Sequence, residues 1–221
     1  MKNSHATRLV RTIAVAAAMG IGSLASASQY APTWGEPVLA PGADIPTDAK
    51  TAALAALQKG KSVPEVSFKN AEGESVTLGS LLKDGPLVLI FYRGGWCPYC
   101  VKQLKVFEAE REAIEAAGGR VVAVSPELPE FVGNTRTKNK IGFAVLSDPG
   151  AVAGRAFGVA WANERYGSGL EKYQGNTKGE IPLGVTYVID PDGTVTWAYL
   201  EHDYKKRATP EQAIEALNAI E

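Results

Sequence analysis

The chain has 221 residues, with 23 Lys and Arg against 24 Asp and Glu, and its formal net charge is −1. This balance argues against nucleic acid or an anionic membrane surface as a partner. The length fits one domain with a substantial core, and 2 cysteines are too few for a disulfide-stapled secreted scaffold.

The N-terminus has the three parts of a secretory signal peptide. Lys2, Arg8 and Arg11 form a positive start, residues 13–24 form an apolar core, and Ala25-Ser26-Ala27 is a small-residue cleavage site. The apolar run is too short to span a membrane. We therefore expect residues 1–27 to be removed and the mature protein to be periplasmic or secreted, without stable membrane insertion. An uncleaved N-terminal anchor is the alternative.

Residues 28–62 are predicted to be an N-terminal extension with one helix, and residues 63–221 the main domain. Residues 29–46 are rich in Pro, Gly and Ala and read as an extended lead-in. The spacing at 48–59 predicts a thin amphipathic helix packed on the main domain, with Thr47 as its cap and Gly60 as its stop. Short strands are expected around the turn at 70–73, at residues 66–69 and 75–78.

In the main domain, apolar runs alternate with helical patterns. The predicted strands are 87–92, 120–125, 143–146, 185–190 and 194–199, the last two forming an antiparallel hairpin. The predicted helices are 102–117, 127–138, 151–157 and 209–220. Residues 160–180 are polar and Gly-rich and are predicted to be an irregular, flexible insertion.

The only two cysteines, Cys97 and Cys100, follow the apolar run 87–92 and precede a helical pattern. Cys97 is therefore expected near a helix N-terminus, where the dipole favours a thiolate. Pro98 suits the first helical position, and Cys100 lies one turn on, close enough for a disulfide. This spacing and context indicate thiol–disulfide chemistry.

Two plainer interpretations of the pair are weaker. A zinc site needs about four ligands, and the only histidines, His5 and His202, are isolated in the sequence. A structural disulfide closing so short a loop stabilises little. We expect no metal and no cofactor, and we interpret His202 as a surface residue.

The order of elements predicts an α/β fold in which a central mixed sheet is flanked by helices on both faces. With a redox pair after the first central strand, this fold is thioredoxin-like.

Residues 91–100 (FYRGGWCPYC) resemble the peroxiredoxin-like branch of the alkyl hydroperoxide reductase/thiol-specific antioxidant (AhpC/TSA) superfamily. The resemblance extends over roughly residues 63–221 and includes 75–85 (SVTLGSLLKDG), 145–159 (VLSDPGAVAGRAFGV), 181–193 (IPLGVTYVIDPDG) and 203–217 (DYKKRATPEQAIEAL). It implies a thioredoxin-like scaffold on which a peroxidatic Cys97 reduces hydroperoxides. The chain departs from the family where a hydroxyl residue and a proline normally precede the cysteine, because Gly94 and Ile90 stand there.

Two chemical routes remain open for the pair. Cys97 could attack a peroxide and form a sulfenic acid, which Cys100 resolves to an intramolecular disulfide. Alternatively, Cys97 could attack the disulfide of an exported protein, as thioredoxins do. Trp96 before the cysteine and a second cysteine only three residues on are similar to the thioredoxin pattern. The peroxidase cycle needs a thiol electron donor, thioredoxin-like or a membrane thiol carrier, to reduce the disulfide. A third alternative is a redox switch on a binding module, with residues 160–180 contacting a partner.

Four further residues are candidates beside the cysteines. Arg93 could stabilise the Cys97 thiolate or a leaving oxygen. Trp96 and Tyr99 are expected to shape the rim of the substrate site. The resemblance implies that Pro182 is cis and faces the redox pair. Arg207 is a weaker candidate, because it lies in a run of basic residues that is typical of a solvated face.

Overall fold

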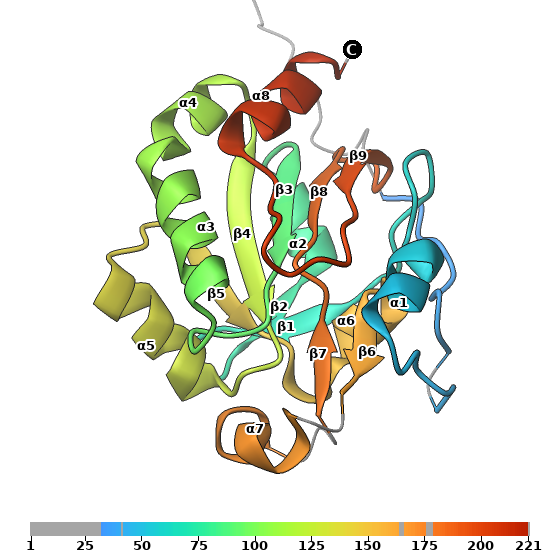
Figure 1. Cartoon of the computed structure of the whole chain (residues 1–221). Coiled ribbons are helices and arrows are strands. Elements are labelled where there is room, and N and C mark those ends of the chain that lie inside the picture. Colours follow the sequence, from blue (N-terminus) through green and yellow to red (C-terminus); the bar gives the residue numbers. More distant parts are fainter. Residues whose placement is uncertain (1–31, 41, 164–165, 176–178, 221) are drawn as a thin grey trace, which may run out of the picture.

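A computed structural model describes residues 32–40, 42–163, 166–175 and 179–220 (Figure 1). The predicted signal peptide, 1–27, lies outside these residues. Within the described part of the chain, none of the helices combines the length and apolar character needed to span a bilayer.

A seven-stranded mixed sheet forms the centre of the molecule, in the order β2-β1-β5-β4-β3-β8-β9. The three central strands are parallel, and the strands outside them run antiparallel to their neighbours. The predicted strands are thus confirmed, and the observed bounds are β1 (Ser67–Lys69), β2 (Ser75–Thr77), β3 (Leu87–Phe91), β4 (Arg120–Ser125), β5 (Ala144–Ser147), β8 (Thr186–Ile189) and β9 (Val195–Tyr199).

Helices cover both faces of the sheet, as the sequence predicts (Figure 1). On one face pack α3 (Pro98–Ala109), α4 (Arg111–Ala116), α5 (Pro129–Asn139) and α8 (Pro210–Asn218). On the other pack α1 (Ala49–Ala55), α2 (Leu78–Leu82) and α6 (Val152–Ala156), the last preceded by a short 3-10 turn at Pro149–Ala151.

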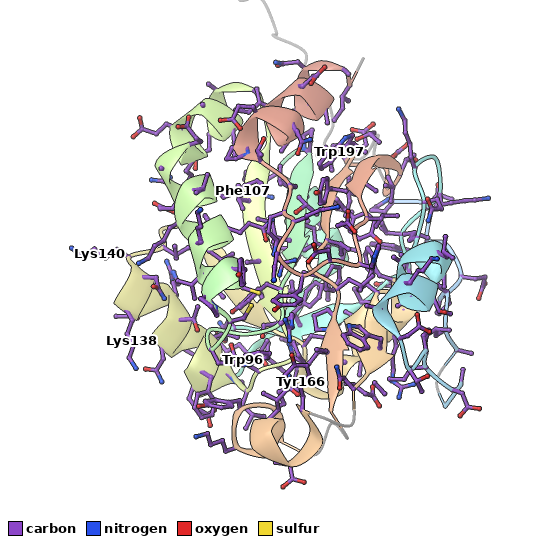
Figure 2. All side chains as sticks on the ribbon, viewed as in Figure 1. Trp96, Phe107, Lys138, Lys140, Tyr166 and Trp197 are labelled. Atoms are coloured by element: carbon purple, nitrogen blue, oxygen red, sulfur yellow. The ribbon has the colours of Figure 1, made fainter. Side chains whose placement is uncertain are left out.

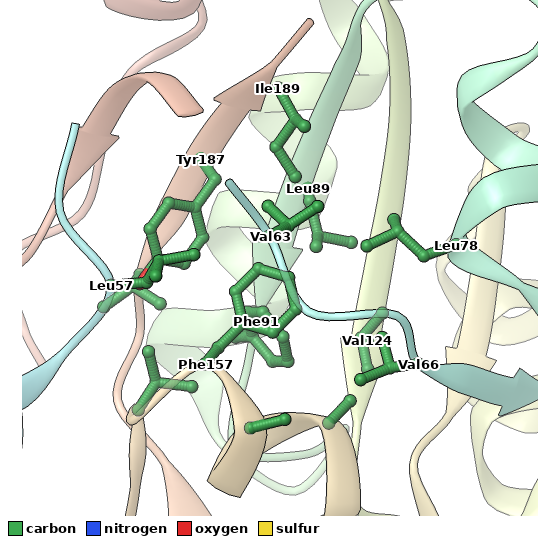
Figure 3. Packing of buried hydrophobic residues seen from close by; sticks show 14 of the residues in the cluster. Leu57, Val63, Val66, Leu78, Leu89, Phe91, Val124, Phe157, Tyr187 and Ile189 are labelled. Carbon is green, nitrogen blue, oxygen red and sulfur yellow. The ribbon is translucent and has the colours of Figure 1, made fainter. Parts of the chain in front are cut away.

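Strand β3 is fully buried because it contributes to both cores. Its residues alternate, so Val88 and Ile90 enter the core under α3 and α8, whereas Leu89 and Phe91 enter the opposite core. Figure 3 shows this second core, where Phe91 lies against Phe157 with ring centroids 5.1 Å apart. A strand anchored on both faces gives the loop that follows it, and therefore the cysteines, a fixed starting point.

Two helix predictions need correction. The first helix is shorter than predicted and is capped by Asp48, whose carboxylate accepts from the Thr51 N–H at 2.9 Å, rather than by Thr47. The predicted helix 102–117 begins earlier, at Pro98, and breaks at Glu110 into α3 and α4.

The prediction of an irregular segment at 160–180 is wrong. Its described residues form β6 (Ala160–Ala162), α7 (Gly167–Gln174) and the start of β7 (Glu180–Pro182), and β6 pairs with β7 in a separate two-stranded sheet. Strand β7 is anchored to α6, because Arg155 of that helix donates from Nε to the Glu180 carboxylate at 2.8 Å. The polar composition hid this structure, since two three-residue strands give no detectable alternation.

Candidate active site

Cys97 is the N-cap of α3, with Pro98 in the first helical turn, as the sequence predicts. The residue has extended backbone angles (φ −92°, ψ 112°), and its side chain makes no capping hydrogen bond. The sulfur is therefore at the positive end of a twelve-residue helix, where a thiolate is favoured.

Both cysteines are buried and in the free thiol form. The pKa of Cys97 is lowered to about 5, chiefly because the Cys100 thiol donates a hydrogen bond to it. The Cys100 N–H and the charges of Arg93 and Arg207 lower it further. Burial and the same Cys97 contact raise the pKa of Cys100 well above its ordinary value. The pair thus consists of an ionised Cys97 and a protonated Cys100.

Arg93 lies at the end of β3 and is buried, with 4% of its surface exposed. Its guanidinium is enclosed by three aromatic rings, with Cζ 4.9 Å from the centroid of Trp96, 5.0 Å from Tyr166 and 4.8 Å from Tyr204. Figure 2 shows Trp96 and Tyr166 below α3, toward α7. The structure thus brings Arg93 beside the cysteine pair, as predicted, within an aromatic cage that the sequence does not reveal.

Arg207 reaches the second cysteine. Its Nη2 lies 3.4 Å from Cys100 Sγ, and its Nη1 donates to the Gly184 carbonyl at 3.3 Å. A Cβ on Gly184 would overlap the guanidinium, so only glycine leaves space for it. The sequence alone favours a lesser role for Arg207 than the structure shows, because Lys205 and Lys206 next to it do have the exposure of a solvated face.

Trp96 and Tyr99, the two aromatic residues of the cysteine motif, both contact rings of the cage around Arg93. Tyr99 is 38% exposed and packs edge-on against Tyr204, with ring centroids 5.5 Å apart. Trp96 is half-buried and packs against Tyr166 at 5.8 Å. Tyr204 and Tyr166 were not predicted, because they lie far from the cysteines in sequence and no local motif marks them.

Glu127 is a buried carboxyl group that the sequence analysis missed as a site residue. One oxygen accepts from the Gly95 N–H at 2.9 Å and from the Ser125 hydroxyl at 3.4 Å. Burial raises the pKa of Glu127 to about 7, against these hydrogen bonds, which lower it. The group therefore titrates near neutral pH directly beneath the loop that carries Cys97.

Position 94 cannot accommodate the hydroxyl side chain that typical peroxiredoxins carry there. Its φ of +148° disfavours side chains, and a Cβ there would overlap Trp96 Nε1 and lie 2.9 Å from Glu127 Oε1. The departure from the family pattern is thus built into the packing of this loop.

Pro182 is trans, which corrects the expectation of a cis bond. It ends β7 in register with Ala160 of β6, and a regular extended strand accommodates the trans form. With Arg93, it lines a cavity of about 190 Å³. Among the described residues, no hydrogen bond joins Pro182 to Cys97 or Cys100.

His202 is exposed, as predicted, although its Nδ1 lies 3.0 Å from the neighbouring Glu201. Among the residues that the structure describes, no three His, Cys, Asp or Glu side chains cluster as metal ligands would.

Comparisons with known proteins place this geometry in a family context. A sequence model described as the AhpC/TSA family matches residues 59–198. The chain is 31% identical over 150 residues to a chloroplastic peroxiredoxin Q of Sedum lineare, covering 68% of this chain and 73% of that protein. It is 28% identical to a chloroplastic peroxiredoxin Q of Gentiana triflora, covering 68% of this chain and 63% of that protein.

Solved structures show the same fold. Peroxidoxin BcpB from Mycobacterium tuberculosis superposes with a TM-score of 0.60 at 22% identity, covering 75% of this chain and 99% of that one. Peroxiredoxin Q from Xanthomonas campestris superposes with a TM-score of 0.55 at 24% identity, covering 70% and 90%.

Proposed function

The chain belongs to the AhpC/TSA family and is a peroxiredoxin-like thiol peroxidase, and we propose that it reduces hydroperoxides through Cys97, with Cys100 as the resolving thiol. The observation that supports this assignment most strongly is the polarisation of the pair. Cys97 has a pKa of about 5 at a helix N-terminus, whereas Cys100 remains protonated behind it.

In the first step the Cys97 thiolate attacks the distal oxygen of ROOH. The S–O bond forms as the O–O bond breaks, and RO⁻ takes one proton to leave as the alcohol ROH. Arg93 and the N-terminus of α3 stabilise the negative charge as it moves from sulfur to oxygen.

In the second step Cys100 gives up its S–H proton and its sulfur attacks the sulfur of the Cys97 sulfenic acid. The S–S bond forms, the S–O bond breaks, and the leaving hydroxide takes up that proton and departs as water. Arg207, 3.4 Å from Cys100 Sγ, stabilises the thiolate that this step requires. An external dithiol, thioredoxin-like or membrane-bound, then reduces the Cys97–Cys100 disulfide by thiol–disulfide exchange and so supplies the two electrons.

Peroxide consumption with dithiothreitol as electron donor tests this assignment. We expect turnover to be lost in Cys97→Ser. In the absence of dithiothreitol, Cys100→Ser treated with one equivalent of peroxide should accumulate sulfenic acid that dimedone traps. Full turnover in Cys97→Ser would contradict the assignment of Cys97. Turnover at the rate of a free thiol would contradict peroxidase function itself.

A thioredoxin-like disulfide oxidoreductase is the second candidate, favoured by Cys100 lying buried behind an N-capping Cys97. In that reaction the Cys97 thiolate attacks a disulfide, and Cys100 then resolves the mixed disulfide. Reduction of a protein disulfide at a rate well above that of dithiothreitol, with no gain in peroxide consumption, would favour this function.

We further propose that the protein is exported, because residues 1–27 have the composition of a cleavable signal peptide. Cell fractionation and N-terminal sequencing of the mature protein test this. We expect a mature protein that begins at Ser28 outside the cytoplasm, and an intact Met1 in the cytoplasmic fraction would contradict it.

A further inference from the structure

Arg93 has a buried charge that its surroundings do not neutralise. None of the described carboxylates forms an ion pair with it, and its Nε lacks a hydrogen-bond partner. The three rings around the guanidinium attract the cation, but a π-face accepts no conventional N–H···O bond. A buried donor without an acceptor is costly, which indicates that a ligand completes the site.

The negative charge of the Cys97 thiolate is not enough to neutralise the charge of Arg93. Arg93 and Arg207 both lower the pKa of Cys97, so two positive charges face one negative charge in the reduced enzyme. Once the cysteines form a disulfide, no negative charge remains between them. One positive charge is therefore available in every step of the cycle.

Arg93 lines the cavity of about 190 Å³, which extends away from the cysteines toward β6 and β7. The other walls are mostly apolar, and none of the lining residues is acidic. They include Ala49, Trp161, Tyr166, Pro182, Leu183 and Tyr204. The cavity is smaller than the ~300 Å³ at which drug-sized ligand sites begin, so it suits a compact molecule.

The cavity adjoins the redox pair at two points. Its Tyr204 ring contacts Arg93 on one side and Tyr99 of the cysteine motif on the other. Its Gly184 accepts from Arg207, which contacts Cys100. A molecule in the cavity is therefore separated from the cysteine pair by side chains that contact both, namely Arg93, Tyr204 and Arg207.

We propose that this cavity binds the carboxylate of a small organic acid against Arg93, and so selects carboxylate-bearing hydroperoxides as substrates. A single guanidinium matches a monoanion and can donate two parallel hydrogen bonds to a carboxylate. The apolar walls then hold a short hydrocarbon body. The substrate assignment rests on the proposed peroxidase function, whereas carboxylate binding does not.

Binding is tested by calorimetry on the Cys97→Ser, Cys100→Ser protein, in which no redox chemistry occurs. The probes are sodium hexanoate, the neutral hexanamide and sodium sulfate. We expect saturable binding of hexanoate, at least tenfold tighter than hexanamide, and no binding of sulfate. Equal affinity for hexanoate and hexanamide would overturn the proposal, and equal affinity for sulfate would overturn its carboxylate assignment.

Two variants locate the site. Arg93→Gln should lower hexanoate affinity at least tenfold, whereas Arg111→Gln, which removes an exposed arginine of α4, should leave it unchanged. Ala49→Leu should also lower the affinity, because it fills the cavity without touching either cysteine. Unchanged affinity in a folded Ala49→Leu protein would overturn the proposal even if Arg93→Gln does not fold.

Kinetics then test the substrate class. Ala49→Leu should lower kcat/KM at least fivefold for a six-carbon hydroperoxy acid and leave the rate with hydrogen peroxide unchanged. An equal effect on both, or none on either, would overturn the selectivity. Failure to reduce any hydroperoxide would instead refute the peroxidase function, while hexanoate binding would stand on its own result.

Discussion

At the residue scale, two arginines lie beside the cysteine pair. Arg93 and Arg207 both act through space on Cys97, and Arg207 also contacts Cys100 directly. Because the Cys100 thiol also donates a hydrogen bond to Cys97, the pKa values of the two thiols shift in opposite directions. This asymmetry makes one sulfur the nucleophile and keeps the other protonated until its turn comes.

The first prediction concerns the ionisation of Cys97. The rate of alkylation by iodoacetamide should rise with pH through about 5 and be flat between pH 6 and 8, since only the thiolate reacts. Arg93→Gln should move the midpoint to higher pH, because it removes a cation that favours the thiolate. Mass spectrometry assigns the alkylated residue. A midpoint near 8.5 in the wild type would show an ordinary free thiol.

The second prediction concerns Gly184. Gly184→Ala should displace Arg207 from Cys100 and slow formation of the disulfide from the Cys97 sulfenic acid several-fold, because a Cβ overlaps the guanidinium. Rapid-quench analysis of disulfide formation after one equivalent of peroxide measures this. Arg207→Gln should have the same effect, and the double variant should be no slower than either.

The control for Gly184→Ala is Gly169→Ala, since a Cβ at this exposed position of α7 meets no atom within 4 Å. Additive slowing in the Gly184→Ala, Arg207→Gln protein would show that the glycine acts on something other than the arginine.

At the element scale, the strand-to-helix junction could be predicted because it is local. The apolar run that forms β3 and the proline at the start of α3 are adjacent in sequence, and they place Cys97 correctly. The rest of the site comes from elements that only the tertiary structure brings together. Arg207 precedes α8, Tyr166 precedes α7, and Glu127 follows β4, so no spacing rule connects them to the cysteines.

The third prediction concerns the docking of α1 and the residues that follow it. Leu57 is buried in the core beneath β8, so Leu57→Ala should lower the free energy of unfolding by about 2–4 kcal/mol. Leu54, in α1 itself, is 77% exposed, and Leu54→Ala should change the free energy of unfolding by less than about 0.5 kcal/mol. Urea denaturation measures both. Equal effects would contradict the packing of this segment on the sheet.

At the scale of the whole molecule, two buried carboxyl groups link folding to pH. Burial raises the pKa of Glu127 to about 7 and that of Asp148 to about 6. Because the folded protein then binds these protons more tightly than the unfolded chain, both groups lower the free energy of unfolding as pH rises from about 4 to 7. The lowered pKa of Cys97 has the opposite effect, because it raises the free energy of unfolding as the pH rises above about 5.

The fourth prediction isolates one of these groups. Relative to wild type, Glu127→Gln should have a free energy of unfolding that is higher at pH 8 than at pH 4.5, by on the order of 2 kcal/mol. The reason is that the neutral amide avoids the cost of a buried carboxylate. Urea denaturation at both pH values gives the difference from wild type. The exposed Glu130→Gln should show almost no such pH dependence. A pH-independent difference for Glu127→Gln would contradict the raised pKa.

The proposed peroxidase function depends most on rapid reaction of the Cys97 thiolate with hydroperoxides, despite the glycine at position 94. Stopped-flow tryptophan fluorescence of the reduced protein tests this directly, because Trp96 adjoins Cys97. We expect a fluorescence change with hydrogen peroxide far faster than the reaction of a free thiol, absent in Cys97→Ser and nearly independent of pH between 6 and 8. A peroxide rate no faster than that of a free thiol, together with rapid reaction with a small disulfide, would contradict it.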